Sequence, residues 1–484
     1  MDPGQRIAEL EAELAAKDAR IAEQDAKLTE QAAKIAKLER DVAALLEKLG
    51  RNSGNSSLPP SSDPPGSRGG SKGKSTKGKR RRGGQAGHRG SHRSLLPAER
   101  VDDIIDFFPV QCEHCCEKLP QTPDPLARRY QSTELPAFEP HTTEYRRHAV
   151  ECPRCKASTC APYDPDKIPS SPFGPRLMSA VALLTGVYHL SRRRTVQLLS
   201  DLVGVKISLG AVSAVEARVS EAVVPAFDEA SERVAKAAVK HTDGTSWLLA
   251  GAMVSLWTIA TACATVFKIV PNGRADTLRP LYGKMRGILV SDRATALNFW
   301  AMERRQICWA HLLRKFVSFE ERAGPAGDFG RELLELTGII FKYWHDYRDG
   351  RLSRDMFVTW MAPVRLQFEA LLERAVAAKV DGLSGSCEDM LSHRLALWTF
   401  VERNDVEPTN NHAERELRAF VLWRKRSFGT QSERGNRFAE RLMTIAHTAR
   451  KQSKNVLELL TACCIAHLDG GSAPSLFEPE RAAA

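Results

Sequence analysis

Residues 241–276 read HTDGTSWLLAGAMVSLWTIATACATVFKIVPNGRAD, and they place a sheet at the centre of the protein. From Trp247 to Phe267 the chain carries no charge for 21 residues, a length that would also suit a membrane-spanning helix. However, β-branched and hydroxyl residues such as Thr258 and Ile259 fill this run, and the turn sequence PNGRAD follows it. We therefore predict adjacent strands of a buried sheet and no transmembrane segment.

Three acids stand at the ends of elements around this predicted sheet. Asp243 comes just before the apolar run, and Asp292 follows the short apolar strand predicted over residues 287–290. Glu414 falls in the first turns of a helix that begins after the cap-forming residues 409–411. Acids from a central strand, a neighbouring strand end and a packed helix are typical of a ribonuclease-H-like site that holds two Mg²⁺ or Mn²⁺ ions. Taken singly, each acid is more readily explained as a surface carboxylate or a helix cap.

Basic residues and a short Cys/His motif accompany these acids. The basic residues after Glu414 would contact DNA phosphates or form a solvated helix face; they are Arg415, Arg418, Arg424, Lys425 and Arg426. Cys308 and His311 form a CxxH motif that fits a packing element between a strand and a helix. As a zinc site, this pair alone would lack two ligands.

Upstream of the sheet, two CxxC pairs are separated by 36 residues, and they are Cys112 with Cys115 and Cys152 with Cys155. Each pair can place two thiolates on one cation, so together they predict a structural Zn²⁺ site in a module with few apolar residues of its own. Cys116 and His114 leave the ligand set open, and a redox motif or chance spacing are the alternatives.

The net charge of +11 is concentrated in one segment. Residues 51–100 carry twelve Lys or Arg and two acids, and residues 71–93 carry no acid at all. Such a basic run is typical of segments that bind the phosphate backbones of nucleic acids. It lacks the interspersed aromatic and leucine residues of a membrane anchor, and a solvated linker is the alternative. The candidate DNA-binding residues here are Lys77, Lys79, Arg80, Arg81, Arg82 and Arg89.

The N-terminal 50 residues show a seven-residue repeat of apolar side chains. Its first seam position holds Ile7, Leu14, Ile21, Leu28, Ile35, Val42 and Leu49, and its second seam position is polar in the middle. This pattern predicts a coiled coil over residues 7–49 that joins two or more copies of the chain. A single amphipathic helix packed on the body is the alternative.

Composition and length set the remaining limits. The chain has 484 residues, of which 42% are hydrophobic and 27% charged, as expected for two to four globular domains. The N-terminal residues are acidic and give no signal peptide, so we expect a cytoplasmic protein. Residues 192–219 have the pattern of helix, glycine-containing turn and helix capped at Ser208, which fits a helix-turn-helix or any helical pair.

Several motifs, in order along the chain, resemble transposases of the insertion-sequence-66 family. They are Asn55-Ser-Ser, GGQAGHRG at 83–90, the two CxxC pairs, Ser291-Asp292, CWAHLLRKF at 308–316, EPTNNHAERELR at 407–418, and Lys425-x-Ser427-Phe428. The resemblance implies an α+β multidomain DDE transposase that cleaves and joins DNA with Asp243, Asp292 and Glu414 as metal ligands. It also implies DNA as partner, accessory transposition proteins, and no membrane. Members of the family commonly carry an acid directly after the first Asp, where this chain has Gly244. This departure keeps open an alternative, a catalytically inactive DNA-binding regulator with the same zipper and zinc module.

The domain order expected from the motifs and the resemblance runs from an N-terminal coiled coil to a ribonuclease-H-like core with an all-helical insertion. The expected boundaries are 1–50 for the coiled coil, 51–100 for a basic disordered linker, 101–168 for the zinc-binding domain, 169–236 for the helix-turn-helix-like segment, 237–320 for the first part of the core, 321–404 for the helical insertion, 405–455 for the last part of the core, and 456–484 for a C-terminal helix and tail.

Overall fold

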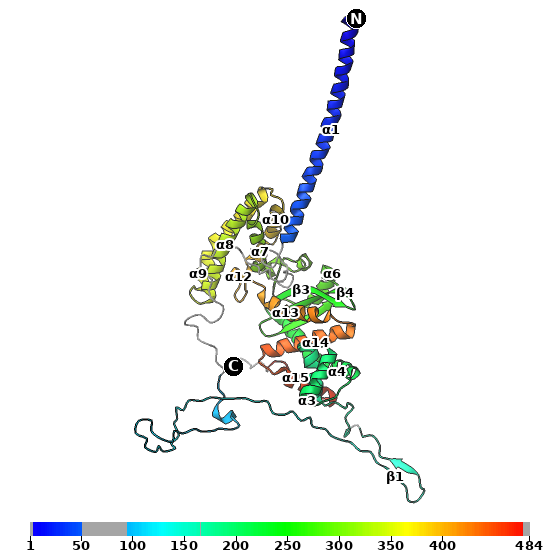
Figure 1. Ribbon diagram of the computed structural model, residues 1–484, viewed down its shortest axis with the longest axis vertical. Coiled ribbons are helices and arrows are strands. Elements are labelled where there is room, and N and C mark those ends of the chain that lie inside the picture. Colours follow the sequence, from blue (N-terminus) through cyan, green and yellow to red (C-terminus); the bar gives the residue numbers. More distant parts are fainter. Residues whose placement is uncertain (1–2, 51–93, 165, 478–484) are drawn as a thin grey trace. The chain divides into compact units, whose positions relative to one another are not determined.

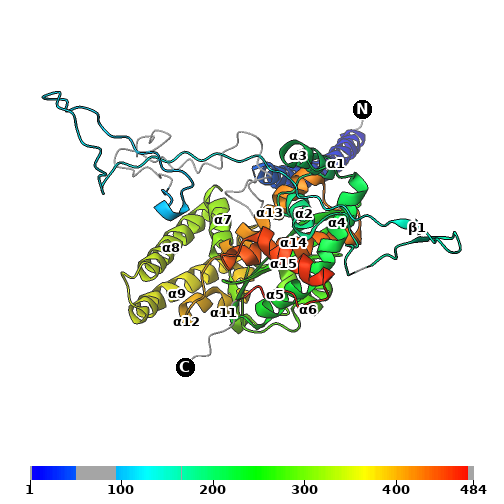
Figure 2. The ribbon, with the colours of Figure 1, turned by 90° about the horizontal axis from the view of Figure 1, so that it is seen from below.

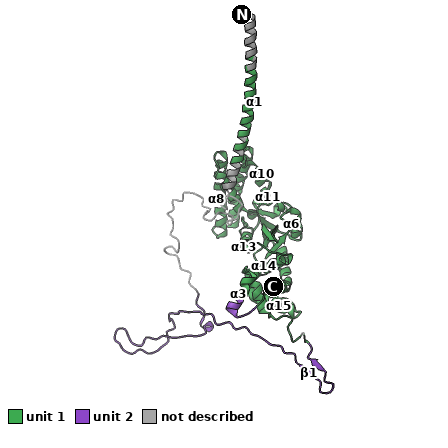
Figure 3. Cartoon of the chain, turned by 45° about the vertical axis from the view of Figure 1, so that its right-hand side comes forward, with its two compact units in different colours: residues 1–71, 163–196, 207–484 green, residues 72–162, 197–206 purple. Residues whose placement is uncertain are grey.

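The computed structural model describes residues 3–50, 94–164 and 166–477 of the chain (Figure 1). The chain divides into two compact units, which Figure 3 colours separately. The first unit consists of residues 1–71, 163–196 and 207–484, and the second of residues 72–162 and 197–206.

A five-stranded mixed sheet forms the centre of the first unit, in the order β5-β4-β3-β6-β7. Its strands are β3 (Val239–Leu249), β4 (Ala252–Ala260), β5 (Thr265–Val270), β6 (Ile288–Ser291) and β7 (Arg305–Ile307). The first three form an antiparallel meander, while β6 pairs parallel with β3, and β7 pairs parallel with β6. The sequence prediction of adjacent strands over the uncharged run is therefore confirmed, as is the short strand before Asp292.

Two helices pack their apolar faces on the meander, α13 (Asn411–Ser427) and α14 (Glu433–Lys451). Leu417, Phe420 and Trp423 recur at the helical spacing that puts them on one face of α13. Together with the strand residues Trp247 and Phe267 they form a buried aromatic cluster. The Trp247 ring meets the Phe420 ring edge-on, with centroids 5.3 Å apart. This packing fixes the rotation of α13 about its axis against β3.

The chain between β7 and α13 is helical. Its elements are α7 (Trp309–Glu320), α8 (Pro325–Arg348), α9 (Arg354–Ala377), α10 (Ser384–Ser392), α11 (Arg394–Leu397) and α12 (Thr399–Glu402). Figure 2 shows α8 and α9 side by side. Both lie within residues 321–404, for which helices are expected from the sequence. Their shared core centres on Trp309, Phe368 and Trp398.

Another helical group precedes the sheet in the chain. It contains α2 (Pro175–Ala182), the π-helical turn η3 (Leu183–Val187), α3 (Arg192–Val203), α4 (Leu209–Ala222) and α5 (Val224–Lys236). The cap predicted at Ser208 is confirmed, because its side chain accepts a hydrogen bond from the Ala211 N–H at 3.1 Å. The C-terminal helix α15 (Val456–Leu468) packs against α2. The short helices η4 (Thr295–Leu297), η5 (Met302–Arg304) and α6 (Ala275–Tyr282) connect strands of the sheet.

The second unit carries little regular structure. Its elements outside α3 are the turn η2 (Ala98–Arg100) and the antiparallel pair β1 (Ala149–Glu151) and β2 (Ser158–Cys160). None of the described residues 94–162 is buried. A module with so little apolar burial needs another source of stability.

The N-terminal helix α1 spans Pro3–Gly50 without a break. Its described seam residues Leu14, Ile21, Leu28, Ile35, Leu38 and Val42 all keep more than half of their surface exposed. In the part of the chain that the structure describes, no helix combines the length and the apolar character needed to cross a bilayer.

Candidate active site

Asp243 and Asp292 lie on neighbouring strands of the sheet. Asp243 stands in the middle of β3, directly opposite Thr258 of β4. Asp292 follows the last residue of β6, which runs parallel to β3 at its other edge. The buried Arg305 side chain fixes the loop after β6, since its guanidinium donates to the carbonyl oxygen of Asp292 at 2.8 Å. Both carboxylates are thus carried by rigid elements.

Glu414 lies in the first turn of α13, and the start of this helix is fastened to both the sheet and α7. The buried Asn410 donates its side-chain N–H to the carbonyl oxygen of Thr242 at 2.7 Å. Its backbone N–H reaches the Cys308 sulfur at 3.1 Å, and the Trp309 N–H donates to the Pro408 carbonyl at 2.8 Å. These bonds hold Glu414 beside β3.

The electrostatics of Asp243 indicate that Asp292 and Glu414 lie near enough to act on its charge. Its pKa is raised to about 8, first because of burial, and then because of the negative charges of Asp292 and Glu414. The Gly244 N–H, which donates to Asp243 Oδ1 at 2.9 Å, and the charge of Arg314 oppose this shift only in part. A partly buried carboxylate among like charges without full compensation is a frequent property of sites that bind a cation or a proton.

Two basic side chains of α7 face Glu414. Arg314 Nη2 lies 3.4 Å from Glu414 Oε2, and His311 Nδ1 lies 3.6 Å from Glu414 Oε1. Both His311 Nδ1 and Glu414 Oε1 are buried without a hydrogen-bond partner. Burial lowers the pKa of His311, which favours its neutral form. Neutral imidazole and an unpaired carboxylate oxygen are groups that a metal ion would satisfy.

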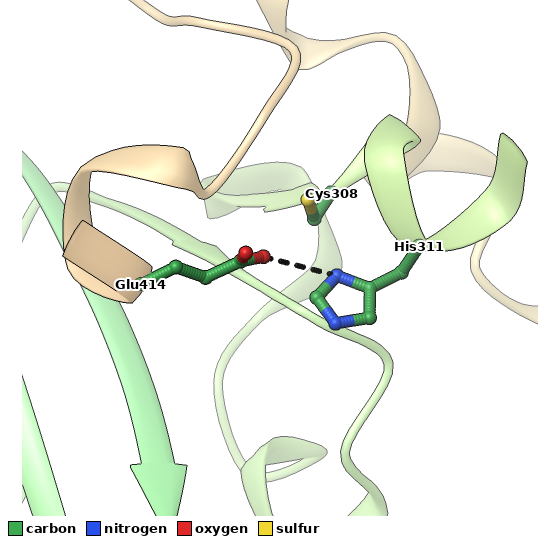
Figure 4. A group of neighbouring side chains, drawn as sticks. All are labelled: Cys308, His311 and Glu414. Carbon is green, nitrogen blue, oxygen red and sulfur yellow. Dashed lines mark ion pairs between the residues drawn. The ribbon is translucent and has the colours of Figure 1, made fainter. Parts of the chain in front are cut away.

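Cys308, His311 and Glu414 lie close together, with their potential metal-ligand atoms all within 4.8 Å of one another (Figure 4). Among the described residues, no other three His, Cys, Asp or Glu side chains are grouped this closely. Sulfur and nitrogen donors favour a transition metal such as Zn²⁺ over Mg²⁺. However, burial raises the pKa of the Cys308 thiol to about 11, so that the thiol remains neutral near pH 7. Its observed contact is the hydrogen bond from Asn410, in agreement with the predicted packing element between strand and helix.

Gly244 lies under the indole ring of Trp257, its direct partner on β4. A Cβ atom at residue 244 would come within 2.8 Å of that ring, closer than real contacts allow. Any side chain here, including the acid common in the resembling family, would have to displace Trp257. Because successive strand residues point to opposite faces, residue 244 also faces away from Asp243.

The basic residues predicted to contact DNA have different surroundings on α13. Arg415, Arg418 and Lys425 are exposed. Arg424 is half-buried, and its guanidinium donates to the Thr245 hydroxyl at 3.3 Å and to the carbonyl and hydroxyl oxygens of Ser246. Arg424 thus fastens the C-terminal half of α13 to β3.

A half-buried ion network, which sequence reasoning missed, lies next to the site on α13. The Glu416 carboxylate contacts His447, Lys451 at 3.1 Å and His412 at 3.6 Å. These contacts hold the pKa of Glu416 well below its usual range, against the opposing effect of burial. The acid at residue 416 is visible in the sequence, but its partners on α14 lie more than 30 residues away, so no local pattern indicates them.

The four cysteines predicted to bind zinc lie on two turns of the same design. The N–H of Cys116 donates to the Cys112 carbonyl at 2.9 Å, and the N–H of Lys156 donates to the Cys152 carbonyl at 2.8 Å. Cys116 and Lys156 both have positive φ, 58° and 61°. Backbone N–H groups of each turn lower the pKa of its first thiol, Cys112 or Cys152. Each turn is therefore suited to present thiolates, although the two pairs are not grouped at ligand distance in the described residues.

The basic run with Lys77, Lys79, Arg80, Arg81, Arg82 and Arg89 lies outside the described residues. Its role in binding DNA stays a prediction.

Comparison with known proteins gives two family matches. The model described as "Transposase IS66 family" matches residues 170–438, more than half of the chain, and this range includes β3, β6, α7 and α13. A family of unknown function matches residues 2–94. No curated protein matches the chain.

Proposed function

Because the chain belongs to the IS66 family of transposases, we propose that it is a DDE transposase that binds the ends of a mobile DNA element, cleaves them to free 3′ ends and joins these ends to target DNA. Asp243, Asp292 and Glu414 are the proposed catalytic acids. The observation that carries this proposal is the raised pKa of Asp243, which the charges of the other two acids help to produce.

The sheet supports a ribonuclease-H-like core. Its central strand β3 pairs antiparallel with β4, beyond which lies β5, and on its other side pairs parallel with β6, beyond which lies β7. Asp243 lies on the central strand, Asp292 follows the adjacent parallel strand, and α13 brings Glu414 across the sheet. In this proposal the helical chain from α8 to α12 is an insertion between the second and third acids.

The three acids fit a pair of Mg²⁺ or Mn²⁺ ions, because carboxylate oxygens are the ligands that hard cations prefer, and because Glu414 Oε1 is buried without a hydrogen-bond partner. When bound, such ions activate the attacking oxygen and stabilise the leaving oxygen in a phosphoryl transfer. Cys308 and His311 belong to the support of the site in this proposal, since Cys308 holds Asn410 at the start of α13 and His311 faces Glu414.

The remaining side chains around the acids position and neutralise charge. Arg314, close to Glu414, offsets part of the negative charge of that carboxylate. The exposed Arg415 and Arg418 continue from Glu414 along α13, where phosphates of a bound duplex can contact them. Gly244 leaves this arrangement intact, since its missing side chain would point to the opposite face of the sheet.

Other parts of the chain would assemble the complex. We propose that residues 7–49 of α1 pair with a second copy, because the described part of their apolar seam, from Leu14 to Val42, is exposed in one chain. The two cysteine turns would hold one structural Zn²⁺, and the basic run would contact DNA backbones. Accessory transposition proteins are further proposed partners, and the proposed compartment is the bacterial cytoplasm.

The experiment uses purified full-length protein and labelled duplex that carries the terminal repeats flanking its gene, with Mg²⁺ or Mn²⁺. We expect cleavage and joined products from the wild type and neither from Glu414→Gln, which keeps the shape of the side chain but removes its charge. Salt-sensitive binding without cleavage by the wild type, also after addition of the proteins encoded beside it, would contradict the proposal and favour the inactive regulator.

A further inference from the structure

Phe428 has a strained backbone and an exposed ring, and neither property stabilises the fold. Its backbone is left-handed, with φ 56° and ψ 32°, which is unfavourable for a bulky residue. Its ring is 71% exposed, so burial does not compensate for the strain. Glycine or asparagine would adopt this conformation more easily.

The strained backbone is required by the turn that follows α13. The Phe428 N–H closes the helix on the Arg424 carbonyl at 2.9 Å, and two residues later Thr430 already pairs with the end of β3. Gly429 passes so close to Leu248 that an added Cβ would lie 2.0 Å from its carbonyl oxygen. The turn thus explains a left-handed residue at 428, but it does not explain an aromatic one.

The surroundings of Phe428 point to an anionic partner that also carries flat rings. Arg415, Arg418, Leu422 and Lys425 are exposed at spacings of three and four residues, so they form one face of α13 that leads from Glu414 toward Phe428. Cations along this face suit phosphates, and an exposed aromatic ring at its end suits a nucleobase.

We propose that Phe428 stacks on a nucleobase of the DNA that lies along α13. The inference rests on the proposed function only in assuming that DNA occupies this face. Glu414 and Phe428 are 14 residues apart, or about 21 Å at the rise of an α-helix. At about 3.4 Å per stacked base, the contacted base lies about six positions from the phosphate at the catalytic acids.

Full-length protein is titrated, in EDTA, against terminal-repeat duplexes that carry a single 2-aminopurine at successive positions. EDTA prevents cleavage, so the measurement reports binding and base unstacking alone. Three substitutions separate the explanations. Phe428→Asn removes the ring and relieves the backbone, Phe428→Tyr keeps both the ring and the strain, and Arg418→Ala removes one phosphate contact.

We expect the emission of 2-aminopurine to rise at a position about six bases from the cleaved bond. Phe428→Asn should abolish this rise, weaken binding about 5- to 20-fold, and melt no lower than the wild type. Phe428→Tyr should keep the rise, and Arg418→Ala should keep it at saturating protein.

The inference would be overturned if Phe428→Asn left both the probe emission and the DNA affinity unchanged. It would also be overturned if this variant melted at a lower temperature but kept the emission rise, because the ring would then serve folding or contact another part of the chain. Glu414→Gln separates the stacking proposal from the proposed transposase activity. This variant should give the same rise in 2-aminopurine emission as the wild type, whether or not the wild type cleaves DNA.

Discussion

Asp243 is a residue at which stability and the proposed chemistry oppose each other. Burial and two neighbouring carboxylates disfavour its charged form, so the folded protein holds a proton here that an unfolded chain releases at much lower pH. An acid whose charge destabilises the fold in this way is typical of sites where a bound cation neutralises that charge.

We predict that Asp243→Asn stabilises the metal-free protein at pH 8.5 by about 1–3 kcal/mol. The folded pKa of about 8 lies above the ordinary value of 3.8. The wild type therefore loses stability as the pH rises through this window, because its folded state binds more protons than its unfolded state. Thermal unfolding in EDTA at pH 8.5 and pH 4.5 measures the effect. A stabilisation that is equally large at pH 4.5 would disprove the titration of Asp243 as its cause.

Gly244 gives a second prediction for a single residue. Gly244→Ala should destabilise the protein by about 1–3 kcal/mol, because the new methyl group overlaps the Trp257 ring. In a Trp257→Leu background the same substitution should have a smaller effect, so the two changes should be non-additive in thermal unfolding. Additive effects would show that the contact with Trp257 does not explain the glycine.

Among the elements, α13 joins the proposed chemistry to the fold. Its first turn carries Glu414, its apolar face packs on β3, and its last turn is fastened to β3 by Arg424. Asn410, just before the helix, bonds to both β3 and Cys308. The position of Glu414 therefore depends on contacts made by residues that need not touch DNA or metal.

Asn410→Ala tests this dependence. We predict a loss of about 1–3 kcal/mol in stability, because the buried Thr242 carbonyl loses its side-chain donor. We also predict a cleavage rate at least tenfold lower, with DNA affinity within twofold of the wild type. Asn411→Ala, at the exposed neighbouring residue, is the control and should match the wild type. Equal cleavage rates in the two variants would show that Asn410 does not position Glu414.

The sequence predicted elements better than it predicted their contacts. β-branched residues identified the strands, because this signal is local. Helix α13 begins at Asn411 as expected, but the side chain of Asn410 does not cap it and instead donates to the Thr242 carbonyl oxygen. Asp292 and Glu414 became candidates because each stands at or near the end of an element, whereas Asp243, expected just before a strand, lies in the middle of β3. By contrast, Arg314 and Asn410 were missed as neighbours of the acids, and Arg424 was assigned to DNA although it bonds β3. These contacts join residues roughly 100 to 180 positions apart, and helical periodicity does not indicate which distant residue a side chain meets.

For the whole molecule, the prediction concerns assembly through α1. We expect the wild type to be a dimer or larger, and Ile21→Lys with Leu28→Lys to be monomeric, because charges in the apolar seam prevent pairing. Ala26→Lys, outside the seam, is the matched control. Light scattering after size-exclusion chromatography gives the mass of each. A seam variant with the mass of the wild type would show that the copies associate through other surfaces.

The central claim is that Asp243, Asp292 and Glu414 together bind the catalytic cations. Its most direct test is the position of Mn²⁺ in anomalous difference maps from crystals of the full chain grown with this ion. We expect density in contact with the carboxylates of all three acids. Density held by Cys308, His311 and Glu414, with none at Asp243 or Asp292, would contradict it.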